Sequence, residues 1–228
     1  MLLPGMDGTG ALFSEFIAVL PSTFEAVTVS YPTERYLPYS ELEDIVRAAC
    51  PISEPFMLIA ESFSTPLALQ YAATNPANLA GLVLCAGFAT SPVRGWRRFL
   101  ASLLAPILFH VPMPSVAARC WLVGADAPSS LLAAVRAAIS SVQPRVLAER
   151  LRAVLVCDVL GVVGQIRVPI LYVRAEQDRL VGISSAEELQ RVSPQMAVAE
   201  LAGPHLLLQR QPRRAAEAVV EFVAAAVI

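Results

Sequence analysis

The stretch Phe56-Met57-Leu58-Ile59-Ala60-Glu61-Ser62-Phe63-Ser64 indicates the fold most clearly, because a short apolar run ends in a serine and a helical pattern follows at once. This arrangement predicts a buried strand that turns sharply into a helix. A nucleophile on so tight a turn needs small residues two before and two after it, since larger side chains would collide there. Ala60 and Ser64 meet that limit. Ser62 is therefore a candidate nucleophile, and a plain helix N-cap is its alternative role.

The same alternation of short apolar runs and helical patterns extends in both directions from this turn. It predicts an α/β fold with a doubly wound, mostly parallel sheet of about six strands. The predicted strands cover 2–3, 26–31, 56–60, 80–86, 169–173 and 196–201, and the predicted helices cover 11–20, 39–50, 64–74, 184–191 and 213–226.

The alternation of strands and helices stops between 88 and 163, where four helical patterns follow one another without a convincing strand. They cover 96–109, 116–123, 129–141 and 144–156. We therefore predict two units: an α/β core formed by 1–87 and 164–228, and a helical cap formed by 88–163.

Composition excludes several classes of function. Charged residues make up only 16% of the chain and the net charge is -2, which argues against a nucleic-acid partner. All 17 basic residues are Arg, so chemistry that needs a lysine amine is excluded. Only two histidines occur, His110 and His205, which makes a zinc site of several imidazoles improbable. We therefore expect no metal and no cofactor.

Two further side chains complete a nucleophilic site. His205 follows a predicted strand in Leu201-Ala202-Gly203-Pro204-His205, and Asp178 lies in the loop that leaves the preceding strand. A serine hydroxyl needs an imidazole to take its proton, and the imidazole needs a carboxylate to hold its tautomer. His110, in the apolar cap, is the weaker candidate for the base. Glu176 is the weaker candidate for the acid, although its position in the sequence does not exclude it.

A glycine-rich loop, Pro4-Gly5-Met6-Asp7-Gly8-Thr9-Gly10, follows the first predicted strand. Its glycine order differs from that of dinucleotide-binding loops, and it lacks the lysine of a phosphate-binding loop. Backbone N–H groups that turn inward here would instead suit an oxyanion.

Taken together, these motifs resemble the α/β-hydrolase superfamily over nearly the whole chain. The resemblance lies in LLPGMDGTG at the start, LIAESFS at the turn, VRAEQDRLV around the acid and LAGPHLLLQ around the histidine, in the superfamily's order of nucleophile, acid and histidine. It implies an oxyanion hole formed by the N–H groups of Met6 and Phe63, and it identifies 88–163 as the cap.

The turn lacks both usual glycines. The chain also starts inside what would be the third strand, so we expect the first two strands of the usual fold to be absent.

The resemblance and the three side chains predict a serine hydrolase that cleaves an ester or thioester of a small, largely apolar acyl group. An acyltransferase, a C–C hydrolase or a peptidase could use the same residues, and a non-catalytic member would bind a ligand or partner on the same scaffold. An aminopeptidase would need acids in the cap to hold the amine of its substrate. Only Asp126, Glu149 and Asp158 are available there.

The cap is rich in apolar side chains, and Trp96, Phe99, Leu103 and Trp121 are candidates for contact with the acyl group. Alternatively, these residues only pack the cap onto the core. Three arginines beside the apolar helix, Arg94, Arg97 and Arg98, also fit contact with a membrane surface. The start of the chain carries no secretory pattern, which predicts a cytoplasmic location.

Overall fold

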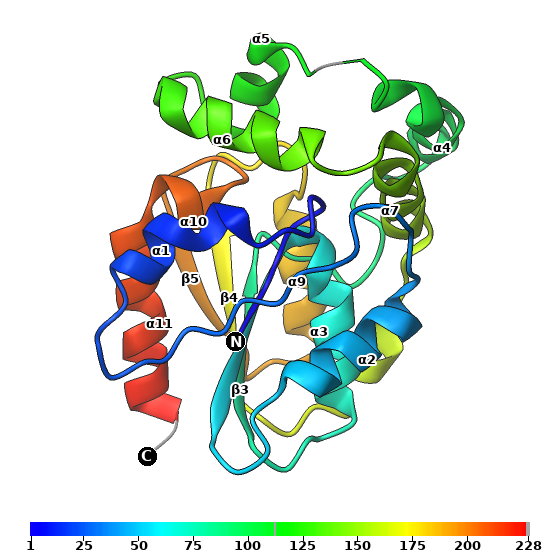
Figure 1. Ribbon diagram of the computed structural model, residues 1–228. Coiled ribbons are helices and arrows are strands. Elements are labelled where there is room, and N and C mark those ends of the chain that lie inside the picture. The colour runs from blue at the N-terminus through cyan, green and yellow to red at the C-terminus, as the bar shows by residue number, and fades with distance from the viewer. Residues whose placement is uncertain (112, 227–228) are drawn as a thin grey trace.

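Five parallel strands form the sheet of the computed structural model, which describes residues 1–111 and 113–226 (Figure 1). The strands lie side by side in chain order, β1 (Leu2–Leu3), β2 (Phe56–Glu61), β3 (Leu79–Cys85), β4 (Ile170–Ala175) and β5 (Ala197–Leu201). Each neighbouring pair is parallel. The carboxyl ends of the strands therefore lie along one edge of the sheet, where an α/β fold usually binds its ligand.

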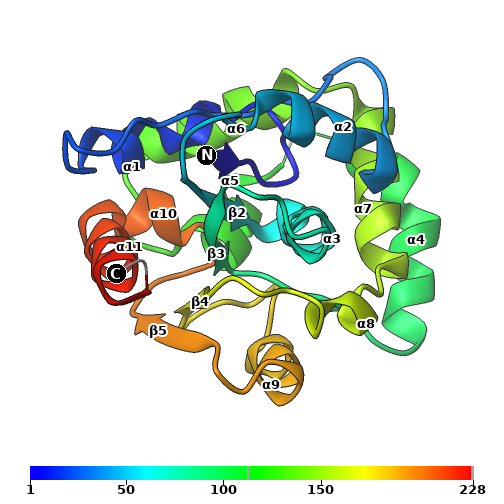
Figure 2. The same ribbon diagram turned by 90° about the horizontal axis from the view of Figure 1, so that it is seen from below.

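The strand side chains alternate between two apolar layers, as expected for a sheet that is covered on both faces. Leu58 and Ala60 pack in one layer, whereas Ile59 between them packs in the other. The first layer includes α2 (Tyr39–Ala49), α3 (Thr65–Ala73), α8 (Leu160–Val163) and α9 (Ile183–Val192). The second includes α1 (Ser14–Ala18), α10 (Leu207–Arg210) and α11 (Pro212–Ala226). Figure 2 shows these helices on the two sides of the sheet. The prediction of a doubly wound, parallel α/β fold is thus confirmed.

The prediction of a strand over 26–31 is wrong. Within this segment only Thr28 forms a bridge, with Leu2, and two backbone hydrogen bonds flank it: Leu2 N–H to Val27 O at 2.8 Å and Val29 N–H to Leu2 O at 2.9 Å. Because β1 has only two residues, it offers a neighbour too few backbone groups for a longer ladder. The described sheet accordingly has five strands, fewer than the six expected.

Between β3 and β4, the described residues form helices and one isolated bridge, between Thr90 and Asp158. The helices are α4 (Trp96–Leu108), α5 (Ser115–Ala118), the π-helical turn η3 (Arg119–Val123), α6 (Ser129–Ser140), α7 (Pro144–Val156) and α8. In Figure 1, α6 crosses above the carboxyl edge of the sheet, and α4 lies beside α7. The four helical patterns expected here are observed, but the boundaries of a separate cap stay a prediction.

Among the described residues, no single helix is long and apolar enough to cross a membrane. Helices α6 and α7 reach that length and hydropathy only as a pair, and the two are bent by 96° relative to each other.

Candidate active site

Ser62 lies at the corner between β2 and the 3₁₀ turn η2 (Ser62–Ser64) that opens α3. Its φ is +47°, in the left-handed region that a serine rarely adopts. The residues two before and two after it, Ala60 and Ser64, are fully buried between strand and helix. This geometry agrees with the size rule inferred from the sequence, and it turns the Ser62 side chain away from the strand toward the carboxyl edge of the sheet.

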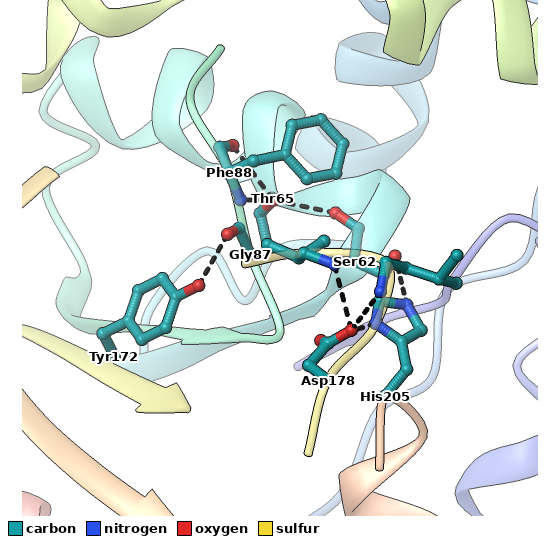
Figure 3. A network of polar contacts seen from close by, with 9 residues as sticks. Ser62, Thr65, Gly87, Phe88, Tyr172, Asp178 and His205 are labelled. Atoms are coloured by element: carbon teal, nitrogen blue, oxygen red, sulfur yellow. Dashed lines mark hydrogen bonds and ion pairs between the residues drawn. The ribbon is translucent and has the colours of Figure 1, made fainter. Parts of the chain in front are cut away.

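The structure brings Ser62, His205 and Asp178 together (Figure 3). The Ser62 hydroxyl lies 2.9 Å from His205 Nε2, and His205 Nδ1 lies 2.7 Å from Asp178 Oδ2. The carboxylate can only accept, so Nδ1–H donates to Asp178 and Nε2 is left to accept from Ser62. The His205 and Asp178 side chains are almost completely buried. Together they form a hydrogen-bonded chain from carboxylate to hydroxyl.

The second oxygen of Asp178 is also occupied. Oδ1 accepts the backbone N–H groups of Leu180 at 2.8 Å and Val181 at 2.9 Å, which fixes the carboxylate toward His205. Glu176, the alternative acid, is exposed to solvent, and it is Asp178 that contacts His205. His110, the alternative base, is exposed just after α4, where its Nδ1 bonds to the Pro106 carbonyl. The structure therefore assembles the three residues preferred from the sequence.

Ser64 ties the turn to the glycine-rich loop. Its hydroxyl donates to the carbonyl of Pro4, and the Tyr31 hydroxyl, 2.6 Å away, donates to the Ser64 oxygen. Burial raises the pKa of Tyr31 above its ordinary value, so this phenol stays protonated and can remain a donor. A glycine at position 64 could make neither bond. The serine that replaces the usual glycine thus has a structural role that its small size alone did not reveal.

Arg150, from α7, holds the same loop from the other side. It is buried, and its Nη1 donates to the carbonyls of Met6 at 2.9 Å and Asp7 at 2.7 Å, while Nη2 donates to the carbonyl of Pro32 at 2.9 Å. A Cβ added at Gly8 would lie 2.5 Å from Nη1, which explains why this loop needs a glycine there. Sequence reasoning missed Arg150, because nothing in its helical pattern separates it from a surface arginine.

Met6 and Phe63, the predicted oxyanion donors, lie on the two segments that these contacts hold together. Met6 N–H donates no hydrogen bond to any of the described residues, so it is free to bind a ligand oxygen. Phe63 follows Ser62 directly in η2. Their role in oxyanion binding stays a prediction.

Thr65 fixes the turn to the loop that follows β3. Its hydroxyl donates to the Ser62 carbonyl at 2.8 Å and accepts from Phe88 N–H at 3.0 Å. The Tyr172 hydroxyl donates to the neighbouring Gly87 carbonyl at 2.7 Å, as Figure 3 shows. These bonds hold the backbone of Ser62 in a conformation that would otherwise cost about 1–3 kcal/mol.

Glu61, the last residue of β2 and the one directly before Ser62, is a buried carboxyl group. Gln209 Nε2 donates to its Oε2 at 3.3 Å, and within the described residues its Oε1 has no hydrogen-bond partner. The pKa of Glu61 is raised to about 7, chiefly by burial and also by nearby Asp7, while His205 and the hydrogen bond from Gln209 act to lower it. An uncharged carboxyl group is therefore present beside Ser62 in mildly acidic solution.

In the parts of the chain that the structure describes, no three His, Cys, Asp or Glu side chains gather closely enough to hold a metal ion. The predicted acyl contacts in the cap are exposed: Trp96, Phe99, Leu103 and Trp121. Their contact with a substrate stays a prediction.

Comparison with known proteins identifies the family of the chain. The family model Hydrolase_4, described as serine aminopeptidase, S33, matches residues 39–202, a range that includes Ser62 and Asp178 and ends before His205. No curated protein sequence matches the chain.

Solved structures share the fold. MenH from S. aureus is 14% identical with a TM-score of 0.77, covering 98% of this chain and 92% of its own. An enol-lactonase from Burkholderia xenovorans LB400 is 17% identical with a TM-score of 0.79, covering 98% and 90%. A thermophilic esterase from Thermogutta terrifontis is 18% identical with a TM-score of 0.80, covering 98% and 88%. At such identities the likeness concerns the fold alone. With most of its length matched by one family model, the chain belongs to the serine aminopeptidase, S33 family of α/β-hydrolases.

Proposed function

We propose that the protein is a serine hydrolase that cleaves an ester or thioester of a small, largely apolar acyl group through an acyl-enzyme. The observation that carries this proposal is the hydrogen-bonded chain from Ser62 through His205 to Asp178. Each member is set for one role: nucleophile, general base, and the carboxylate that orients the base and stabilises its cation.

In the first half of the reaction, the Ser62 oxygen attacks the acyl carbonyl carbon while its proton passes to His205 Nε2. The carbonyl oxygen becomes an oxyanion, for which the N–H groups of Met6 and Phe63 are the proposed donors. The C–O or C–S bond then breaks, and the leaving group takes the proton from Nε2. In the second half, water donates a proton to Nε2 and its oxygen attacks the acyl carbon. The bond between that carbon and the Ser62 oxygen then breaks, the Ser62 oxygen takes the proton back from Nε2, and the carboxylic acid leaves.

The contacts of the glycine-rich loop support the oxyanion assignment. Catalysis of this kind needs donors that are fixed before charge develops, because reorganisation during the reaction would raise the barrier. Ser64 holds this loop to the nucleophile turn through Pro4, and Arg150 holds it through the carbonyls of Met6 and Asp7. The Met6 N–H is therefore held in place relative to Ser62.

The family description favours a second candidate, an aminopeptidase. Such an enzyme needs carboxylates to hold the free amine of its substrate. The three acids of the cap already have partners: Asp126 pairs with Arg210 at 2.8 Å, Glu149 pairs with Arg152 at 2.5 Å, and Asp158 accepts from Leu160 N–H at 3.3 Å. These partners weigh against the aminopeptidase and leave the ester hydrolase as the better-supported proposal.

The test combines covalent labelling with a substrate series. A fluorophosphonate probe should label the wild type and should not label Ser62→Ala, while Ser184→Ala, which alters an exposed serine in α9, serves as the matched control. Among p-nitrophenyl esters from acetate upward, kcat/KM should rise with chain length, since each buried methylene contributes about 0.8 kcal/mol. Labelling of Ser62→Ala would refute the mechanism. Faster cleavage of amino-acid p-nitroanilides would assign the aminopeptidase instead.

A further inference from the structure

Helix α4 carries an apolar stripe that faces solvent. Seven large apolar residues recur at spacings of three and four, which places them on one side of the helix. Their exposed fractions range from 42% to 74%. They are Trp96, Phe99, Leu100, Leu103, Leu104, Ile107 and Leu108.

The opposite side of α4 is the one that packs inward. It carries small residues, and among the residues of this helix only Ala105 is fully buried, with Ala101 and Ser102 partly covered. Figure 2 shows α4 at the periphery of the molecule, with α7 between it and the sheet. A surface helix of a globular protein normally buries its apolar side, so the orientation of α4 is inverted. Such an orientation leaves a large apolar surface that a further partner would cover.

The charge around this stripe indicates what that partner is. The sequence holds no Asp or Glu from Ser62 to Ala125, although the chain as a whole has a net charge of -2. Arg97 and Arg98 are exposed at the start of α4, and neither forms an ion pair with a described residue. Arg94 nearby is held by Glu188 at 3.6 Å. Glu188 and Asp158 line the same hollow as Arg94 and Arg98 at the start of the helix, but α4 itself carries no acid. An apolar face of this kind, flanked by two arginines that form no ion pair with a described residue, complements an anionic lipid surface.

A second copy of this chain would fit the stripe less well. In a two-fold symmetric dimer the same patch meets itself. Arg97 and Arg98 lie within the first turn of α4, and the helix contains no acid that could pair with them across such an interface. A lipid bilayer supplies both the apolar layer and the negative charge.

We propose that α4 is a membrane-surface anchor, which lies in the plane of an anionic bilayer with its apolar stripe among the acyl chains and Arg97 and Arg98 at the headgroups. The proposal is independent of the hydrolase activity proposed above, because it concerns binding alone. It also accounts for Trp96, an indole at the end of the stripe, where tryptophan favours the interface between water and lipid.

The experiment measures co-sedimentation of the full chain with vesicles of phosphatidylcholine containing phosphatidylglycerol, beside vesicles of phosphatidylcholine alone. The wild type should bind the anionic vesicles more tightly. Leu103→Asp should weaken binding by about tenfold or more, because one large apolar contact is lost and a negative charge is added. Ile52→Asp is the matched control, since Ile52 is 94% exposed and lies outside the cap helices. It should bind like the wild type.

Two further measurements locate the contact. A Trp121→Phe variant leaves Trp96 as the only tryptophan, whose emission should shift to shorter wavelength on anionic vesicles. Replacing Arg97 and Arg98 by Gln should reduce the preference for anionic over neutral vesicles.

Equal vesicle binding by the wild type and Leu103→Asp would overturn the proposal, as would an absence of binding by the wild type. A concentration-dependent dimer that Leu103→Asp abolishes, without vesicle binding, would assign the stripe to a second copy and likewise overturn it. The substitutions lie on exposed positions, and thermal unfolding of each variant checks that it is folded.

Discussion

Replacing Glu61 by Gln should change how the stability of the protein depends on pH. The pKa of Glu61 is about 7 in the folded protein, against 4.5 for an ordinary glutamate, because the carboxyl group is completely buried. Between these two values the folded state holds a proton that the unfolded state has released. Stability therefore falls as pH rises from about 4.5 to about 7 and is constant with respect to this group above pH 7.

The size of the effect follows from the shift. The pKa of Glu61 lies about 2.5 above that of an ordinary glutamate. At about 1.4 kcal/mol for each pH unit, this difference corresponds to about 3 kcal/mol of stability lost by pH 8. Gln has nearly the same shape and does not titrate. The free energy of unfolding of Glu61→Gln minus that of the wild type should therefore increase by about 3 kcal/mol between pH 4.5 and pH 7, whatever constant offset the amide introduces.

The measurement is urea unfolding of both proteins at half-unit steps from pH 4.5 to 8.5, followed by circular dichroism. Glu34→Gln removes an exposed carboxylate and controls for the loss of one negative charge. A difference between Glu61→Gln and the wild type that stays flat, or that falls with pH, would refute the reasoning. Such a result would mean that the pKa of Glu61 in the folded protein is not raised above its ordinary value of 4.5.

Three further predictions concern the site and its supports. His205→Ala should lower kcat for p-nitrophenyl esters by several orders of magnitude and Asp178→Asn by less, with unfolding curves of both variants checking that the fold is retained. Arg150→Met should reduce the free energy of unfolding by about 3 kcal/mol, since three carbonyls lose a charged donor, and should lower kcat/KM; urea unfolding and ester hydrolysis test both parts. Ser64→Gly, which restores the usual glycine, should destabilise by about 1–3 kcal/mol because the Tyr31 hydroxyl loses its partner, and a higher midpoint of urea unfolding would contradict this.

The fold was largely predictable because its central strands are almost entirely apolar. Runs such as 56–61 and 79–85 have few alternatives to a buried strand. The segment 26–31 has a strand pattern of its own, but its neighbour β1 has only two residues to pair with it. Strand formation there depended on the length of the partner, which local pattern does not specify.

The candidate site was predictable where chemistry restricts the choice of residue. Two histidines and one tight turn left few combinations, and the structure joins Ser62, Asp178 and His205. The supports of the site were not predictable, because their function depends on contacts between distant segments. Arg150 in a helical pattern suggests solvent, yet it is buried against a loop more than a hundred residues earlier in the chain. The outward orientation of α4 is a similar case, since periodicity defines an apolar side without indicating where it points.

The contact between Arg150 and the Asp7 carbonyl joins segments 143 residues apart, and the same separation divides Ser62 from His205. Contacts of such high sequence separation form late in folding, after local helices and neighbouring strands have reduced the entropy of loop closure. The contacts of Arg150 with Asp7 and of His205 with Ser62 are therefore both in place only after nearly all of the polypeptide has been synthesised and has become compact. During synthesis on the ribosome, the nascent chain would carry an ordered nucleophile turn long before it carries a competent base. On the proposed mechanism, a chain that has not yet been synthesised as far as His205 lacks its general base and should not hydrolyse esters.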